Sequence, residues 1–277
     1  MAAASKISSY QARPANAEGM VNYNRTENQT WQILSQRQNR IIENRASVEY
    51  LHGLNILQLP TDRIAQIPEV NSVLQDVTGW QLEPVAAVIP FGEFFNLLSQ
   101  RKFPAATFIR RAEDIDYLQE PDIFHEIYGH CPMLTDPVFA DFVQAYGVLG
   151  CRASPRERVY LARLFWFSVE FGLINTEQGI RAYGAGILSS HGETVYALED
   201  TSPERKPWDV MTVLRTPYRI DIMQPVYYQI ESYQQLYQAM EDNLMDKVHE
   251  AMELGLFAPS YTLPSTNIKQ SPDKHDC

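Results

Sequence analysis

The chain has 277 residues with 45% hydrophobic content, which is enough to fill the core of one large domain or two small ones. Its formal net charge is -11, and its basic residues are too scattered to follow a phosphate backbone, so no nucleic acid partner is expected. No stretch approaches the roughly 18 apolar residues of a membrane span, and the N-terminus lacks the apolar segment of a signal peptide.

The three cysteines, Cys131, Cys151 and Cys277, match neither a closed disulfide framework nor a CxxC metal clip. A reducing compartment is the simplest interpretation. We therefore expect a cytoplasmic protein that has no membrane partner.

The two ends of the chain are predicted to be disordered tails. Residues 1–25 are rich in Ala, Ser, Asn and Gln, and residues 258–277 carry Pro, Ser, Lys and Asp. Residues 26–257 contain no repeat and no low-complexity linker, so they are predicted to form one domain.

Helical periodicity dominates the first half of that domain. Apolar side chains from Trp31 to Ile42 predict an early helix, and Pro68 opens a short one that runs toward Gly79. Short extended segments are expected at residues 82–89 and 106–109, which are too few for a large sheet.

The second half is also predicted to be helical. Residues 158–174 are apolar on nearly every face, which is typical of a buried helix. Residues 232–254 carry apolar side chains at three- and four-residue steps, which predicts one long helix. The predicted fold class is therefore mainly α with minor β.

The stretch PDIFHEIYGHCP at residues 121–132 contains two of the six histidines of the chain, His125 and His130. Five residues along a regular α-helix rotate by about 140°, which would point the two imidazoles apart. Both can reach one metal ion only if the helix ends at Gly129 and the chain turns there. A metal site thus requires a break at Gly129.

Two other interpretations of the histidine pair are open. The zinc-protease motif HExxH places its histidines four residues apart on one helix face, and the additional residue here breaks that geometry. The histidines can also be ordinary core or surface residues, although two of them beside a predicted helix end weaken that interpretation.

Glu170 is the best candidate for a third ligand. It lies in LFWFSVEFGLI, a segment so apolar that an ionised carboxylate there must be paired or bound to a cation. A buried ion pair with Arg163 or Arg181 is the alternative. Two histidines and one carboxylate form the facial triad that is typical of non-haem Fe(II) oxygenases, which favours the metal.

Arg110 follows an extended apolar segment, and its guanidinium group is suited to hold a carboxylate through two hydrogen bonds. A solvated surface charge is the commoner state of an arginine.

Four strings of the sequence resemble the pterin-dependent aromatic amino acid hydroxylases, closest to the short bacterial type that hydroxylates phenylalanine. They are EPDIFHEIYGH at residues 120–130, FWFSVEFGL at 165–173, AYGAGILSS at 182–190 and QPVYYQIES at 224–232. The resemblance covers residues 79–232 and implies the catalytic fold of that family.

The resemblance implies that His125, His130 and Glu170 are the iron ligands and that the reaction needs Fe(II), a tetrahydropterin and O2. It implies that Phe94 stacks on the pterin and that Glu126 contacts the pterin through solvent. The expected activity is hydroxylation of the ring of L-phenylalanine to give L-tyrosine.

For the amino acid, the resemblance implies that Arg110 binds the carboxylate and that Asp122 holds Arg110 in place. Trp166 and Ser189 are expected to line the amino acid pocket, and Ser189 also to orient His125. Glu126 and Ser189 are accordingly predicted to assist catalysis.

The sequence departs from the animal members of the family at Leu118, Phe165 and His191, and His191 adds a possible stray metal ligand. Ile220 stands where relatives specific for tyrosine carry an acidic residue, which favours phenylalanine, and tryptophan remains an alternative substrate. Prolines in the C-terminal tail bar the long assembly helix of the animal enzymes, so a monomer is expected.

Three functions are therefore weighed. The first is the iron monooxygenase, the second a zinc hydrolase that uses the same three ligands with Glu126 as base, and the third a helical binding protein whose histidines only pack.

Overall fold

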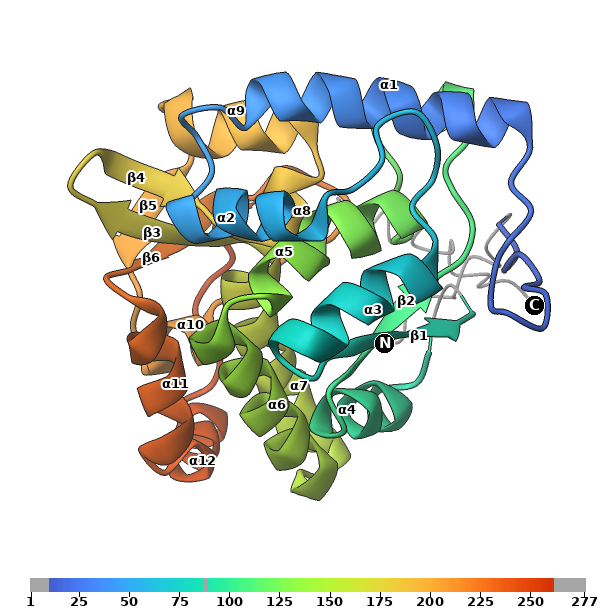
Figure 1. The fold of residues 1–277 in the computed structure, drawn as a ribbon. Coiled ribbons are helices and arrows are strands. Elements are labelled where there is room, and N and C mark those ends of the chain that lie inside the picture. The colour runs from blue at the N-terminus through green and yellow to red at the C-terminus, as the bar shows by residue number, and fades with distance from the viewer. Residues whose placement is uncertain (1–9, 87–88, 262–277) are drawn as a thin grey trace, which may run out of the picture.

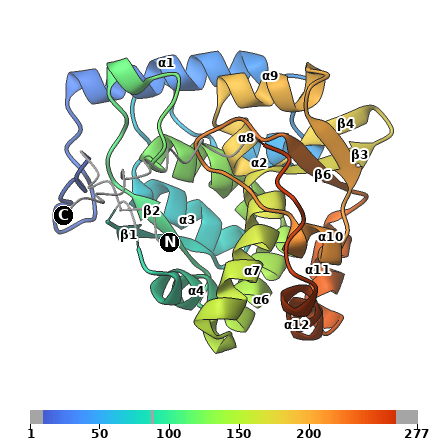
Figure 2. The same ribbon diagram turned by 180° about the vertical axis from the view of Figure 1, so that it is seen from behind.

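The computed structural model describes residues 10–86 and 89–261, and it is mainly helical with two small sheets. Figures 1 and 2 show α1 running along one edge of the molecule, while α4, α6, α7, α11 and α12 lie toward the opposite edge. The predicted class, mainly α with minor β, is confirmed.

The helices of the described residues are α1 (Arg25–Ile41), α2 (Val48–Leu57), α3 (Ile67–Val77), α4 (Phe91–Ser99), α5 (Cys131–Leu134), α6 (Pro137–Arg152), α7 (Pro155–Phe165), α8 (Ala185–Leu188), α9 (His191–Glu199), α10 (Val210–Arg215), α11 (Tyr233–Glu241) and α12 (Leu244–Leu254). Three shorter or irregular turns complete them: the 3-10 turn η1 (Ala112–Asp114) and the π-helical turns η2 (His125–His130) and η3 (Trp166–Glu170).

Two sheets are present among the described residues. In the first, β1 (Gln81–Val85) pairs in parallel with β2 (Lys102–Ala106). In the second, the order is β4-β3-β6-β5, with strands β3 (Gly172–Thr176), β4 (Gly179–Ala182), β5 (Glu204–Pro207) and β6 (Val226–Ile230). Only β3 and β4 are antiparallel, as expected for strands that a two-residue turn connects.

The early helix is confirmed as α1, and its start is specified locally. Asn24 accepts a hydrogen bond from the Glu27 backbone N–H while the Glu27 carboxylate accepts one from the Asn24 N–H, which forms a capping box. Its buried face carries Trp31, whose ring meets Phe124 edge to face at 5.4 Å. This contact packs α1 against the segment that leads into η2.

The helix toward Gly79 is confirmed as α3, but three other predicted elements are wrong in extent. The extended segment expected at residues 106–109 lies earlier, in β2, where it pairs with β1. The predicted helix over 158–174 ends at Glu170, and Leu173 and Ile174 belong to β3. The predicted helix over 232–254 is two helices, because Asn243 adopts a left-handed backbone conformation with φ of 49°.

The predicted N-terminal tail differs from the structure where the structure describes it. In residues 10–24, Val21 and Tyr23 are buried, and the Tyr23 hydroxyl donates to the Thr107 carbonyl at 2.8 Å. The segment is ordered with few apolar residues because long-range hydrogen bonds hold it. Residues 1–9 and 262–277 of the predicted tails lie outside the described residues.

Candidate metal centre

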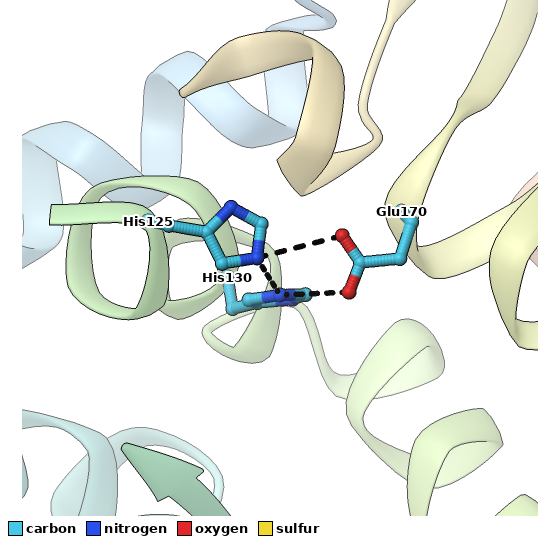
Figure 3. A group of neighbouring side chains, drawn as sticks. All are labelled: His125, His130 and Glu170. Atoms are coloured by element: carbon cyan, nitrogen blue, oxygen red, sulfur yellow. Dashed lines mark hydrogen bonds and ion pairs between the residues drawn. The ribbon is translucent and has the colours of Figure 1, made fainter. Parts of the chain in front are cut away.

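Three side chains far apart in sequence meet at one point of the structure. The Nε2 atoms of His125 and His130 are 3.1 Å apart, and Glu170 places its two carboxylate oxygens 3.5 and 3.2 Å from them, respectively. Figure 3 shows both imidazoles leaving one helical segment and the Glu170 carboxylate facing them from another. Within residues 10–86 and 89–261, this is the one cluster of three His, Cys, Asp or Glu side chains with metal-ligand geometry.

The separations fit one cation. Two ligands that lie about 2.1 Å from an ion and roughly at right angles to each other are about 3 Å apart. The three nitrogen and oxygen pairs are close to that separation, and a set of two imidazoles and one carboxylate suits Fe(II). The residues present therefore fit the metal that the sequence predicts.

The predicted helix end at Gly129 is wrong, and a different irregularity brings the histidines together. The chain stays helical from His125 into α5, but η2 is a π-helix. In a π-helix the hydrogen bonds join residues five positions apart, so side chains at that spacing lie on one face. The five-residue spacing of His125 and His130 therefore serves the purpose that a four-residue spacing serves in an α-helix.

Glu170 also ends a π-helical turn. The Phe171 backbone N–H donates to the Trp166 carbonyl at 2.9 Å, five residues earlier, and the chain then enters β3. Such turns are frequent at functional sites. Both protein segments that supply ligands thus depart from regular α-helix at the metal centre.

The two histidines favour the ionised form of the largely buried Glu170 carboxylate. Burial opposes its ionisation, but His130 and His125 outweigh burial and hold the pKa of Glu170 below its ordinary value. The alternative ion pairs are absent among the described residues, since Arg163 and Arg181 each donate through Nη1 to a backbone carbonyl instead.

His125 is held in the neutral form that metals bind. Burial, reinforced by the neighbouring His130, lowers its pKa to about 4. Its Nδ1 lies 2.9 Å from the Ser189 hydroxyl, and with Nε2 facing the metal centre, Nδ1 carries the proton and donates to Ser189. Ser189 follows α8, which approaches η2 closely because Gly129 has no side chain: a Cβ there would lie 3.0 Å from the Ala185 carbonyl oxygen.

Asp122 links Arg110 to the metal-binding turn. Its carboxylate accepts from the Arg110 N–H, Nε and Nη2 at 2.8–2.9 Å and from the His125 N–H at 3.0 Å. Burial raises the pKa of Asp122, but Arg110 and these backbone donors outweigh it, so the net pKa is lowered. No described residue accepts a hydrogen bond from Nη1 of Arg110, so this nitrogen can take a ligand.

Trp166 begins η3, and two residues that the sequence did not single out hold it. Its ring stacks on Tyr218 at 4.4 Å, and its Nε1 donates to the Gln224 side-chain carbonyl at 3.0 Å. Gln224 in turn donates to the Arg219 and Ile222 carbonyls. Gln224 lies in the string QPVYYQIES, so the family pattern was the signal that could have identified it.

The residues predicted to meet the pterin come from two elements, α4 and the histidine turn η2. Phe94, on α4, contacts the ring of Phe165 edge to face at 5.2 Å, and Phe165 lies 6.5 Å from the His130 ring. Glu126 is buried, and burial, reinforced by Glu170 and Asp122, raises its pKa well above the ordinary value.

Of the residues that depart from the animal pattern, Leu118 is half-buried and Phe165 packs beside His130. His191 is not part of the metal cluster, and its Nδ1 is buried without a hydrogen-bond partner among the described residues. The stray-ligand expectation is thus not supported. Ile220 is half exposed, and its carbonyl accepts from the Tyr117 hydroxyl at 3.2 Å.

The model of the biopterin-dependent aromatic amino acid hydroxylase family matches residues 4–258. The chain belongs to this family. Membership removes the zinc hydrolase and the non-enzymatic binding protein from consideration, and the triad is the candidate for a metal site in this pterin-dependent family. No helix of the described residues is long and apolar enough to cross a membrane.

Named relatives agree with the family assignment. The chain is 54% identical to a phenylalanine-4-hydroxylase of Vibrio cholerae over 92% of this chain and 88% of the relative. It matches the apo structure of the cold-active phenylalanine hydroxylase of Colwellia psychrerythraea with a TM-score of 0.88 and 51% identity, covering 90% of this chain and 97% of the other.

A third relative concerns the metal. The phenylalanine hydroxylase of Chromobacterium violaceum, solved with bound Fe(III), matches with a TM-score of 0.84 and 38% identity over 91% of this chain and 94% of the other. The family match makes a pterin a cofactor of this hydroxylase, and the bound iron is a property of that relative.

Proposed function

We propose that this hydroxylase converts L-phenylalanine to L-tyrosine with O2, Fe(II) and a tetrahydropterin. The observation that carries the proposal is the convergence of His125, His130 and Glu170 in a chain that is 54% identical to a phenylalanine-4-hydroxylase. When bound, Fe(II) and the tetrahydropterin together activate O2, and the pterin supplies two electrons.

We assign the metal to the triad. His125 and His130 bind through Nε2 and Glu170 through its carboxylate, which leaves coordination positions for oxygen. Ser189 supports this arrangement because its hydroxyl oxygen accepts a hydrogen bond from the Nδ1–H of His125. This hydrogen bond fixes the tautomer and the direction of the ring.

We assign the amino acid carboxylate to Arg110. Asp122 occupies one edge of the guanidinium group, at Nε and Nη2, and leaves Nη1 for the substrate, so the arginine is oriented before the substrate arrives. Trp166, fixed by Tyr218 and Gln224, supplies an apolar wall for the aromatic ring. Binding the ring against such a wall keeps water from the reacting carbon.

We assign the pterin to the face that Phe94 and Glu126 approach. Phe94 offers its ring for stacking, and the buried Glu126 carboxyl offers polar oxygens to a pterin or to bridging water.

Activity assays with defined components test the proposal. The protein is loaded anaerobically with Fe(II), then given tetrahydropterin, O2 and either Phe, Tyr or Trp, and the products are identified by mass. We expect tyrosine only when Fe(II), pterin and phenylalanine are all present, with one oxygen atom derived from O2. Oxidation without pterin, or faster turnover of tryptophan than of phenylalanine, would contradict the proposal. A Glu170→Gln variant, which lacks the anionic ligand, serves as the matched inactive control.

We also propose that the enzyme is a cytoplasmic monomer made of one catalytic domain, residues 26–257, to which residues 10–24 are fastened. Free Cys131 and Cys151 suit a reducing compartment. Light scattering of the holoenzyme should give a mass near 31.8 kDa, whereas a multiple of that mass contradicts the monomer. Cell fractionation tests the location.

A further inference from the structure

The N-terminal strap, which we define as residues 10–23, lies against the segment that carries Arg110. The Arg13 backbone N–H donates to the Thr107 hydroxyl at 2.7 Å, and the same hydroxyl donates to the Arg13 carbonyl at 3.0 Å. The Tyr23 hydroxyl donates to the Thr107 carbonyl from the other end of the strap. Three hydrogen bonds thus fix Thr107, three residues before Arg110.

Tyr10 fastens the segment on the other side of Arg110. Its hydroxyl accepts from the Arg111 backbone N–H at 3.1 Å and donates to the Asp114 carboxylate. Its ring stacks on Phe108 at 4.7 Å with an interplanar angle of 20°, and the Arg111 guanidinium lies over the same ring. The strap therefore contacts the residues on both sides of Arg110 and leaves the Arg110 side chain to Asp122.

A cavity adjoins the strap. It has a volume of about 460 Å³ and lies between the strap, the start of α1 and the segment from Phe108 to Glu113, with Tyr10, Arg13 and Glu27 among its lining residues. Phe108 and Ile109 are buried, so packing holds part of this segment, and the contacts of Tyr10 and Thr107 fasten it to the strap beside the cavity.

These contacts bear on substrate recognition. On the far side, Asp122 holds the Arg110 backbone N–H and one edge of the guanidinium group, at Nε and Nη2. The remaining Nη1 lies in the same plane, so its position depends on the Asp122 contact and on the backbone at residues 110 and 111, where Tyr10 holds the Arg111 N–H. A misplacement of a binding group by about 1 Å is enough to reduce binding and turnover strongly.

We propose that Tyr10 is a positioning residue for Arg110 and that the strap sets the enzyme's affinity for the carboxylate of its amino acid substrate. The inference rests on the proposed function, because it takes Arg110 as the group that binds that carboxylate. It adds a role for the N-terminal segment, which makes no contact of its own with the metal ligands among the described interactions.

The Tyr10→Phe variant tests this role because it keeps the ring and removes only the hydroxyl. In the Fe(II)-loaded enzyme we expect the KM for L-phenylalanine to rise about three- to tenfold, the worth of one or two hydrogen bonds, while kcat and the KM for tetrahydropterin stay within about twofold. Tyr237→Phe is the matched control, since the Tyr237 hydroxyl has no hydrogen bond among the described residues. An equal rise in both KM values, or none, would overturn the proposal.

A double-mutant cycle identifies the path of the effect. Calorimetry measures L-phenylalanine binding to Tyr10→Phe, Arg110→Lys and the combined variant, with melting temperatures as the check on folding. If Tyr10 acts through Arg110, the loss in the combined variant is smaller than the product of the single losses; independent, multiplicative losses contradict the inference. If Tyr10→Phe is poorly folded, Asp114→Asn removes the charged acceptor of the same hydroxyl and is read in the same way.

The outcomes separate the inference from the proposed function. If the parent enzyme neither binds nor hydroxylates L-phenylalanine, the proposed function fails. If the parent binds L-phenylalanine and Tyr10→Phe binds it equally well, only the role of the strap fails.

Discussion

Asp122 joins the two halves of the site through a single carboxylate. It neutralises Arg110, which is assigned to the substrate, and it accepts a hydrogen bond from the backbone N–H of His125, which is assigned to the metal. A buried, hydrogen-bonded pair of this kind contributes little net stability but is costly to break, because the partner is left charged and unpaired. Its role here is geometric, because it fixes the position of Arg110 relative to the metal-binding turn.

Ser189 gives the first prediction at this scale. In Ser189→Ala the Nδ1 proton of His125 loses its acceptor, so the ring is free to change tautomer and direction. We expect iron affinity or kcat to fall about 10- to 100-fold, the usual cost of losing such a partner of a metal ligand. Bound iron per chain and initial rates check the outcome. Ser99→Ala, in which the lost hydroxyl only donates to a helix carbonyl, should match the parent.

Glu193 gives a prediction for pH dependence. Burial raises the pKa of its carboxyl, although the Gln224 N–H and the Tyr227 hydroxyl both donate to its Oε1 and partly oppose the rise. The folded pKa therefore exceeds the unfolded value, and the unfolded state loses its proton first as pH rises. The contribution of Glu193 to stability is then full below the unfolded pKa and is lost as pH rises through the folded pKa.

The Glu193→Gln variant isolates this effect, because its side-chain carbonyl still accepts both hydrogen bonds and never ionises. We expect it to be more stable than the parent at pH 7 and to lose less stability between pH 4.5 and pH 8. Urea unfolding at several pH values measures the difference. Parallel curves for the two proteins would show that Glu193 does not titrate in that range.

At the scale of elements, the contact between α4 and α6 depends on glycines. A Cβ at Gly150 would lie 1.9 Å from Cδ1 of Phe95, and the neighbouring Phe94 contacts the Phe95 ring at 5.7 Å. We expect Gly150→Ala to destabilise the protein by about 1–3 kcal/mol and, by displacing α4, to raise the KM for the pterin more than that for phenylalanine. Denaturation and steady-state kinetics check both effects.

Gly92→Ala, a glycine substitution within α4 itself, is the matched control. The nearest side-chain atom to its added Cβ is Nη1 of Arg158 at 3.4 Å, an ordinary contact with the end of a flexible chain. Because alanine favours helix over glycine, this variant should be neutral or stabilised by up to about 1 kcal/mol. Similar losses from both glycine substitutions would indicate that α4 tolerates no change, rather than that its contact with α6 is tight.

The π-helical turns mark the limit of what the sequence predicts about these elements. The triad could be proposed from residue types and burial, and the five-residue spacing shows that a regular helix could not serve it. Spacing alone does not say whether the helix ends or widens, because both bring the histidines together. The backbone hydrogen-bond pattern around Gly129 decides between the two, and α8 packs on η2 at that residue.

The same reasoning explains the other differences. The apolar periodicity continues across Asn243, so the sequence pattern of α11 and α12 looks like that of one helix. The left-handed backbone conformation of Asn243 separates the two helices, and the apolar pattern does not record it. The strap has little periodicity, and its amino-acid composition resembles that of a disordered tail. What orders it is hydrogen bonding to Thr107 and Arg111 about a hundred positions away, which a local pattern cannot record.

At the scale of the whole molecule, the metal centre joins parts of the chain that are far apart in sequence. His125 and His130 belong to η2 beneath α1, and Glu170 leads from η3 into the four-stranded sheet. A cation bound to all three ties these parts together in the folded state only. Metal binding is thereby linked to the stability of the entire domain.

Iron removal tests this linkage. At free Fe(II) about 100 times its Kd, folding gains about 2.7 kcal/mol, and in a chain of this size each kcal/mol shifts the Tm by roughly 2–4 °C. We therefore expect the anaerobic Fe(II) protein to melt about 5–10 °C above the chelator-treated protein. His130→Ala should melt at the same temperature with and without Fe(II), whereas His52→Ala, which removes an exposed histidine of α2, should keep the full shift. A shift that survives in His130→Ala would place the stabilising metal outside the triad.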